Sequence, residues 1–112
     1  MKPHPPARTS VLVIGQEGFL GSYIYSYLQR LGYDVLGTSK QGDCGDLAFS
    51  LGATSPSTLP LKGIDACVIC AGITGVRECE DASRESAAVN VHAISILVRE
   101  LTANDIFTIF LS

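Results

Sequence analysis

The chain has 112 residues, a length that suits one domain, and 46% of them are hydrophobic while 17% are charged. This composition can bury a core and excludes an intrinsically disordered chain. The net charge of −3 argues against a surface built for nucleic acid. No window approaches about 18 consecutive apolar residues, which argues against a membrane-spanning helix.

Charge and proline fill the first residues without an apolar segment, so we expect residues 1–9 to be a flexible leader and not a secretion signal. Cys67 and Cys70 fall within an apparent strand, where positions i and i+3 point to opposite faces of a sheet. They cannot then share one metal ion, and we predict no metal site. Buried, reduced cysteines of a cytoplasmic protein explain the pattern.

The first part of the chain predicts a strand, a helix and a second strand. Residues 10–15 are rich in β-branched residues and end at glycine, which is typical of a strand buried on both faces. Apolar side chains then recur at helical spacing within residues 18–31: Leu20, Ile24, Tyr27 and Leu31. Gly32 is expected to end this helix, before a strand over 33–39. Such a βαβ unit forces its two strands to be parallel.

The later elements are less regular. Residues 40–46 are expected to be a loop, 47–51 either a short strand or a helical turn, and 52–60 a segment broken by prolines. Three longer elements follow: a strand over 64–72, a helix over 82–103 and a strand over 105–112. Two adjacent rows at helical spacing mark a wide apolar arc: Ala87, Val91, Ile94, Val98 and Leu101, and Asn90, Ile94, Leu97 and Leu101. Asn90 is the polar residue within this arc. Alternating strands and helices predict an α/β fold with a parallel sheet of about five strands.

A glycine-rich turn, GQEGFLG, joins the first strand to the first helix. Gly15, Gly18 and Gly21 stand where a dinucleotide-binding turn needs them, for a tight turn, for close approach of a pyrophosphate, and for close packing of helix on strand. The N–H groups of the helix start attract phosphate. The pattern therefore predicts a Rossmann-type dinucleotide site, with tight packing around no ligand as the alternative. Glu17 must point to solvent in such a site, because its carboxylate repels phosphate.

The second strand ends in GTSK, where Thr38, Ser39 and Lys40 offer hydroxyls and a cation but no acid. An acid at this point binds the ribose hydroxyls of NAD, whereas basic residues accommodate the 2′-phosphate of NADP. The sequence therefore favours NADP over NAD, while an ordinary exposed loop lysine remains the alternative interpretation of Lys40.

These motifs, in this order, resemble the extended short-chain dehydrogenase/reductase family, also called the NAD-dependent epimerase/dehydratase family. GQEGFLG is similar to its GxxGxxG motif, and GDL (45–47) to its Asp-Leu pair. DACVICAGIT resembles its fourth strand with the loop along the cofactor, CEDASRESAAVNVHAISILVREL its next helix, and IFTIFLS its fifth strand. The likeness covers residues 10–112. Within the family, AGIT, CE, VNV and FLS are most similar to the sugar-nucleotide reductases typified by dTDP-4-dehydrorhamnose reductase.

The resemblance implies roles for the matching residues. The pyrophosphate would be held by Gly15, Gly18, Phe19, Leu20 and Gly21. Asp46 and Leu47 would hold adenine, and Ala71 and Gly72 would pass close to the nicotinamide ribose. Asn90 would support the active site through the helix and a water relay. A satisfied core amide is the alternative for Asn90, and a turn acid the alternative for Asp46.

The family's chemistry also implies a Tyr-x-x-x-Lys pair, in which the lysine lowers the pKa of the tyrosine that exchanges a proton. The positions four residues after the tyrosines hold no lysine: Tyr27, Gln29, Leu31 and Gly37. The family's catalytic serine or threonine would fall one position past Ser112. The chain is therefore expected to be the N-terminal part of a reductase acting on a nucleotide sugar, binding cofactor weakly and catalysing nothing alone. A stand-alone binding module or redox sensor and a structural remnant without ligand are the alternatives.

The last predicted strand contains IFTIFL, which is strongly apolar. Such a strand at a sheet edge pairs readily with another copy. We therefore expect self-association through this edge or its neighbouring face.

Overall fold

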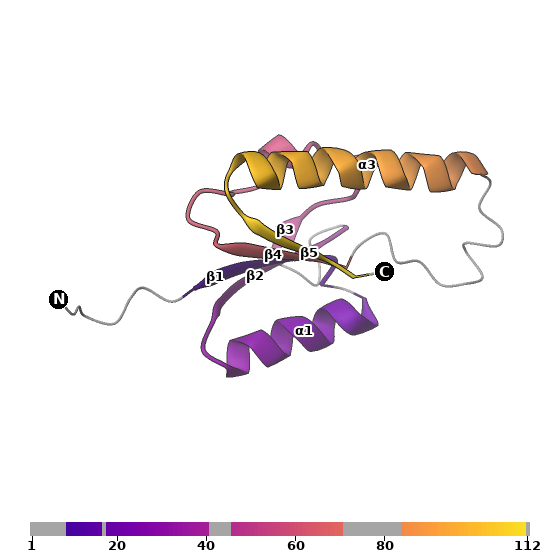
Figure 1. Cartoon of the computed structure of the whole chain (residues 1–112). Coiled ribbons are helices and arrows are strands. Elements are labelled where there is room, and N and C mark those ends of the chain that lie inside the picture. The colour runs from indigo at the N-terminus through magenta and orange to yellow at the C-terminus, as the bar shows by residue number, and fades with distance from the viewer. Residues whose placement is uncertain (1–8, 17, 41–45, 71–83, 112) are drawn as a thin grey trace.

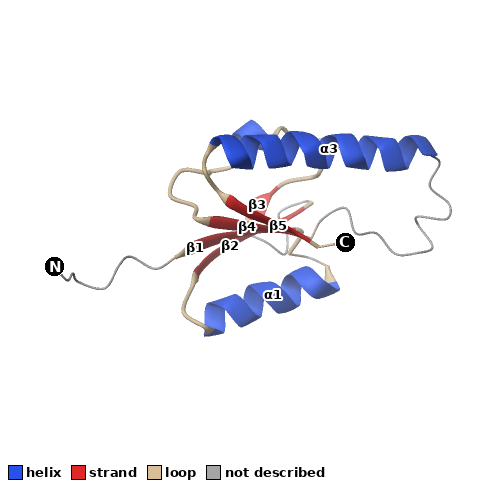
Figure 2. Cartoon of the chain, in the orientation of Figure 1, coloured by secondary structure: helices blue, strands red, loops and turns tan. Residues whose placement is uncertain are grey.

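The computed structural model describes residues 9–16, 18–40, 46–70 and 84–111, with the backbone alone for 84–90. The described strands form one five-stranded sheet in the order β3-β2-β1-β4-β5. Their bounds are β1 Ser10–Ile14, β2 Asp34–Ser39, β3 Leu47–Ala48, β4 Ala66–Ile69 and β5 Phe107–Phe110. Helix α1 (Phe19–Arg30) covers one face of the sheet, and α3 (Arg84–Ala103) covers the other (Figures 1 and 2). A short 3₁₀ helix, η1 (Pro56–Thr58), lies on the α3 side.

All neighbouring strands in this sheet are parallel. β1 lies at the centre, because it pairs with β2 on one side and β4 on the other. The chain therefore adds β2 and β3 on one side of β1, and then β4 and β5 on the other side. The predicted α/β class with a parallel sheet is confirmed, and residues 47–51, which the sequence left open, contain the short edge strand β3.

Side chains of the central strands alternate between two cores, one on each face. Leu12 and Ile14 pack with Cys67 and Ile69 against the α3 side, where Leu97 lies fully buried. The core on the α1 side consists of Val11, Val13, Val68 and Cys70, with Ile24 and Leu28 of α1 packed against it. The prediction that β1 is buried on both faces is confirmed. Burying each large aliphatic side chain contributes about 1.5–3 kcal/mol, so both cores stabilise the sheet.

The predicted apolar face of α1 is wrong at Leu20, Tyr27 and Leu31, whose side chains are exposed. Helix α1 instead meets the sheet through Gly21, Ile24 and Leu28, a row displaced around the helix. The cause is Gly21, which is buried and brings the helix backbone onto the strand–turn junction. This close backbone contact fixes the rotation of the helix.

The predicted rows of α3 are wrong at Val91, which is exposed. The buried row runs through Ala93, Leu97 and Leu101, with Val98 packed beside it. The wide apolar arc of the sequence is thus only partly covered by the sheet. The side chains of Ala87 and Asn90 lie outside the described part of the chain.

Both helices end in the same hydrogen-bond pattern. At the end of α1, the Gly32 N–H donates to the Gln29 carbonyl at 3.0 Å and the Tyr33 N–H donates to the Leu28 carbonyl at 3.1 Å. Gly32 has a φ of +97°, as this Schellman motif requires, so the predicted helix end is confirmed. After α3 the corresponding residue is Asp105, with a φ of +57°.

Gly21 offers a test of how α1 is seated. A Cβ atom there would overlap the Gly15 carbonyl oxygen and lie 3.0 Å from the Gly15 carbonyl carbon. Because both contacts are with backbone, Gly21→Ala should lower the free energy of unfolding by about 2 kcal/mol in urea denaturation. Gly18→Ala is the matched control, since its Cβ would lie 3.7 Å from the nearest atom, an ordinary contact. Equal stability of Gly21→Ala and wild type would contradict this packing.

Candidate functional site

The carboxyl end of β1 meets the start of α1 where the strand order reverses around β1. Figure 1 shows both long helices beginning on the side toward which the strands run, with the start of α3 extending beyond the sheet. In open parallel sheets, ligands bind in the crevice outside this edge, at such a switch point. The predicted glycine turn therefore lies at the position where this type of sheet binds ligands.

Hydrogen bonds to Thr38 hold the glycine turn on β2. The Gly15 N–H donates to Thr38 Oγ1 at 3.1 Å, and the Gln16 N–H donates to the Thr38 carbonyl at 2.6 Å. Gly15 itself has a φ of +91°, a conformation that glycine adopts without strain. Thr38 is fully buried, so any contribution it makes to a cofactor site runs through the turn.

The first turn of α1 is open to an anion. Its N-cap is Gly18, no side chain in the described part of the chain caps the helix, and no acidic residue lies in the first turn. The N–H groups of a first helical turn have no partner within the helix and carry partial positive charge. The side chains of Phe19 and Leu20 are exposed around this opening. Gly18, in extended conformation, leaves room for a ligand to approach the backbone.

Asp46 lies beside the end of β2 and is joined to it twice. Its N–H donates to the Gly37 carbonyl at 2.9 Å, and its Oδ2 accepts from the Gly37 N–H at 2.9 Å. The same Oδ2 accepts from the Tyr25 hydroxyl at 3.0 Å. Burial raises the pKa of Tyr25, and the hydrogen bond and charge of Asp46 raise it further. Tyr25 therefore keeps its proton and remains a donor at neutral pH.

The other predicted residues of this edge differ in exposure. Ser39 is buried, whereas Lys40 is exposed. Leu47 is half-buried and pairs with Thr38 across the sheet. The structure thus brings the three glycines, Thr38 and Asp46 to one edge, with Lys40 at the end of β2. Glu17, Ala71, Gly72 and the Asn90 side chain lie outside what the structure describes, and the predictions for them stay predictions.

Sequence reasoning missed two partners of this edge, Tyr25 and Gln16. The side-chain Oε1 of Gln16 is buried, has no hydrogen-bond partner among the described residues, and lies over Gly37. An isolated glycine within a strand signals the close approach of another group, so Gly37 is the feature that pointed to this contact. No periodicity in the sequence pointed to Tyr25, which stands on the flank of its helix.

The two cysteines that the structure describes, Cys67 and Cys70, offer no chemistry at this edge. Cys67 and Cys70 are free thiols in the two opposite cores, as predicted. Burial raises the pKa of Cys67 to about 12, with a smaller contribution from Cys70, and burial also raises the pKa of Cys70. Both thiols stay protonated and are poor nucleophiles and metal ligands. Within the described ranges, no three His, Cys, Asp or Glu side chains gather as a metal site would require.

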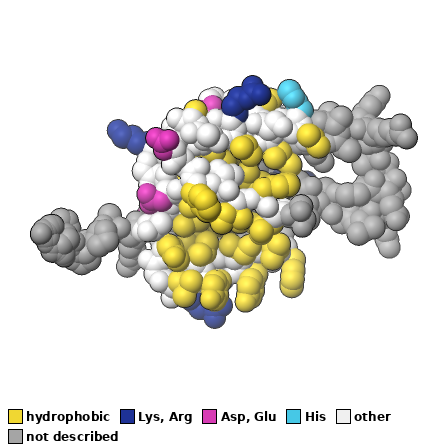
Figure 3. Space-filling view, viewed as in Figure 1, with side chains coloured by type: hydrophobic (Ala, Val, Ile, Leu, Met, Phe, Trp, Pro, Cys, Tyr) yellow, Lys and Arg dark blue, Asp and Glu magenta, His cyan; other side chains and the backbone are white. Residues whose placement is uncertain are grey.

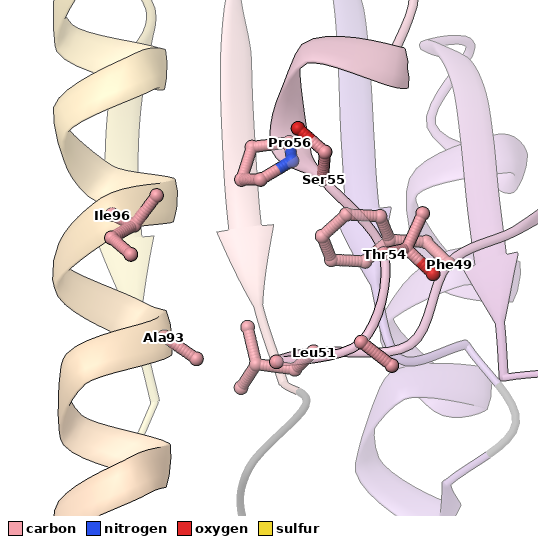
Figure 4. A pocket seen from close by; sticks show the side chains of 9 residues that line it. Phe49, Leu51, Thr54, Ser55, Pro56, Ala93 and Ile96 are labelled. Carbon is pink, nitrogen blue, oxygen red and sulfur yellow. The ribbon is translucent and has the colours of Figure 1, made fainter.

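A separate hollow of about 320 Å³ lies on the α3 side of the sheet (Figure 4). Across it, Ala93 and Ile96 of α3 face the segment that runs from the end of β3 into the first residue of η1. The segment's contribution is Phe49, Leu51, Gly52, Ala53, Thr54, Ser55 and Pro56. No charged side chain lines it, so it does not suit a phosphate-bearing ligand.

Among the described helices, none is long and apolar enough to cross a bilayer.

Comparison with known proteins agrees with the geometry of the glycine turn. The family model described as NAD dependent epimerase/dehydratase family matches residues 11–112. A search of curated proteins found no match. The open helix start and the room at Gly18 fit a dinucleotide pyrophosphate, and the parallel sheet is the one this family uses. The chain therefore belongs to the NAD-dependent epimerase/dehydratase family, the extended short-chain dehydrogenases/reductases, and is a domain that binds a nicotinamide dinucleotide.

Proposed function

We propose that the chain is the NADP-binding N-terminal part of a cytoplasmic extended short-chain reductase that acts on a nucleotide sugar. The observation that carries the cofactor part is the glycine turn. Gly15 is fixed to Thr38, which delivers the uncapped start of α1 to the carboxyl edge of the sheet. The choice of a nucleotide sugar as substrate rests on the resemblance of AGIT, CE, VNV and FLS to the sugar-nucleotide reductases.

In this proposal the chain's own residues bind and orient the cofactor, which supplies the hydride exchange when bound. The pyrophosphate would be held by the N–H groups of Phe19 and Leu20, where helix polarity favours negative charge, and it would approach the backbone at Gly18. Gly21 allows the helix to pack close enough for this approach. Asp46 and Leu47 hold the adenine end.

The preference for NADP is supported by the end of β2. Residues 38–40 carry no acid that would repel a 2′-phosphate, and Lys40 is exposed there as a cation. Thr38 and Ser39 are buried, so direct contact with that phosphate is assigned to Lys40 and the two hydroxyl residues support the strand end.

Because none of the four tyrosines precedes a lysine by four residues, we propose that these 112 residues bind cofactor without catalysing hydride transfer. The same observation favours a second candidate, a binding module or redox sensor without catalysis. Such a sensor would respond to the dinucleotide and not through Cys67 or Cys70, whose pKa values are raised by burial. The sequence downstream of residue 112 distinguishes the two: a Tyr-x-x-x-Lys pair there supports the reductase.

Gly18→Val tests the cofactor site. Gly18 has a φ of −75°, which valine adopts, and a Cβ there meets only ordinary contact, so the variant should fold. Its side chain would occupy the space that the pyrophosphate needs. Calorimetric titration should therefore detect NADPH binding to wild type and none to Gly18→Val, while Ser26→Ala on the exposed face of α1 binds as wild type does. Failure of wild type to bind NADPH or NADH at millimolar concentration would refute the site.

Lys40→Ala tests the choice of cofactor. Removing the cation should weaken NADPH binding about tenfold, roughly the effect of losing one charge-assisted contact, and leave NADH binding nearly unchanged. The preference should also fall as salt is raised, since Lys40 is exposed. Lys62→Ala, at an exposed lysine in the loop before β4, is the matched control. An equal loss for both cofactors would remove Lys40 from the specificity site.

We also propose self-association through the outer edge of β5, which has one neighbour, β4, in the described sheet. Phe107, Ile109 and Phe110 are exposed on it, and β5 carries no charge to oppose pairing. Figure 3 shows hydrophobic side chains gathered between the two long helices on the viewed face. Sedimentation should show wild type associating as concentration rises and Ile109→Lys remaining monomeric, with Val91→Lys on α3 as the control. A monomeric wild type at high concentration contradicts this edge pairing.

A further inference from the structure

The carboxylate of Asp46 is held by two donors that come from different elements. The Gly37 N–H of β2 donates to Oδ2 at 2.9 Å, and the Tyr25 hydroxyl of α1 donates to the same oxygen at 3.0 Å. Neither bond uses Oδ1. Since the Asp46 N–H also bonds the Gly37 carbonyl, both the backbone and the side chain of Asp46 are fixed against β2.

Tyr25 reaches Asp46 because Gly37 has no side chain. A Cβ atom at Gly37 would lie 2.9 Å from Tyr25 Cδ2, so the ring passes close over the strand. The close packing of Gly21 against Gly15 fixes the rotation of α1 so that Tyr25 faces Gly37 of β2. The neighbouring tyrosines of the helix, Tyr23 and Tyr27, are exposed and stack on each other with ring centroids 6.2 Å apart.

We propose that Tyr25 is a positioning residue that holds Asp46 so that Oδ1 accepts a hydrogen bond from the exocyclic amine of adenine. This inference rests on the proposed cofactor site. A carboxylate only accepts hydrogen bonds, so it matches the amine of a 6-aminopurine and opposes the carbonyl oxygen that hypoxanthine has there. A site that expects a donor rejects the analogue lacking it, and the rejection is strongest when the acceptor cannot turn away. Tyr25 and Gly37 together prevent that turn.

The test compares NADPH with its deamino analogue, in which hypoxanthine replaces adenine. Wild type should bind NADPH about tenfold or more tightly than the analogue, the range expected for one good base-edge contact. Tyr25→Phe should reduce this ratio several-fold, chiefly by weakening NADPH binding, because the Gly37 N–H is then the remaining donor that holds Oδ2. Tyr23→Phe is the matched control, since that hydroxyl bonds nothing in the described part of the chain, and it should keep the wild-type ratio.

Asp46→Asn provides a second, independent readout. With Tyr25 and Gly37 donating to the amide oxygen, the amide NH₂ faces the base and should reverse the preference in favour of the deamino analogue. Adding Tyr25→Phe to this variant should reduce the reversal. These changes are in the ratio of two affinities, which a general loss of stability does not alter.

An unchanged ratio in folded Tyr25→Phe, or an equal weakening of both dinucleotides, overturns the positioning role. If Tyr25→Phe does not fold, the absence of any reversal in Asp46→Asn overturns it instead. Failure of the underlying cofactor site has a different signature, because neither dinucleotide then binds wild type.

Discussion

The two hydrogen bonds between the glycine turn and Thr38 are the contacts on which the rest of the edge depends. Gly15 and Gln16 donate to the side chain and backbone of this one buried residue. They lock the end of β1 to the end of β2 and so determine where α1 begins. The packing of Gly21 against Gly15 then fixes how α1 is rotated. Because the hydrogen bonds to Thr38 fix the start of α1 and Gly21 fixes its rotation, Tyr25 reaches Asp46, whereas Tyr23 and Tyr27 do not.

This arrangement separates two roles that glycine plays in one motif. Gly21 serves the fold, because any side chain there meets backbone. Gly18 is left without a steric need inside the protein, since its φ and its surroundings accept a larger residue. A glycine that the fold does not require is best explained by a ligand that approaches it, which is why Gly18 is central to the proposed dinucleotide site.

Much of the fold could be predicted from the sequence, because it depends on local signals. The apolar run of β1, the glycine turn and Gly32 each specify their own structure within a few residues, and together they give a parallel α/β sheet. The rotation of α1 could not be predicted, because Leu20, Tyr27 and Leu31 have the helical spacing of a buried face but Gly21 determines which face is buried. Likewise the polar side chain of Thr38 suggested a contact with a ligand, whereas its hydroxyl oxygen accepts a hydrogen bond from the Gly15 N–H. The bond between Tyr25 and Asp46 joins residues 21 positions apart and depends on that same rotation.

We propose above all that the carboxyl edge of the sheet, organised by the glycine turn, holds a nicotinamide dinucleotide. Titrating ¹⁵N-labelled protein with NADPH and following backbone amide shifts tests this directly, since each residue reports separately. We expect the largest changes at Gly15, Gly18, Phe19 and Leu20, with a second group at Gly37 and Asp46. Changes confined to the hollow between α3 and the segment before η1, or no changes at millimolar NADPH, would contradict it.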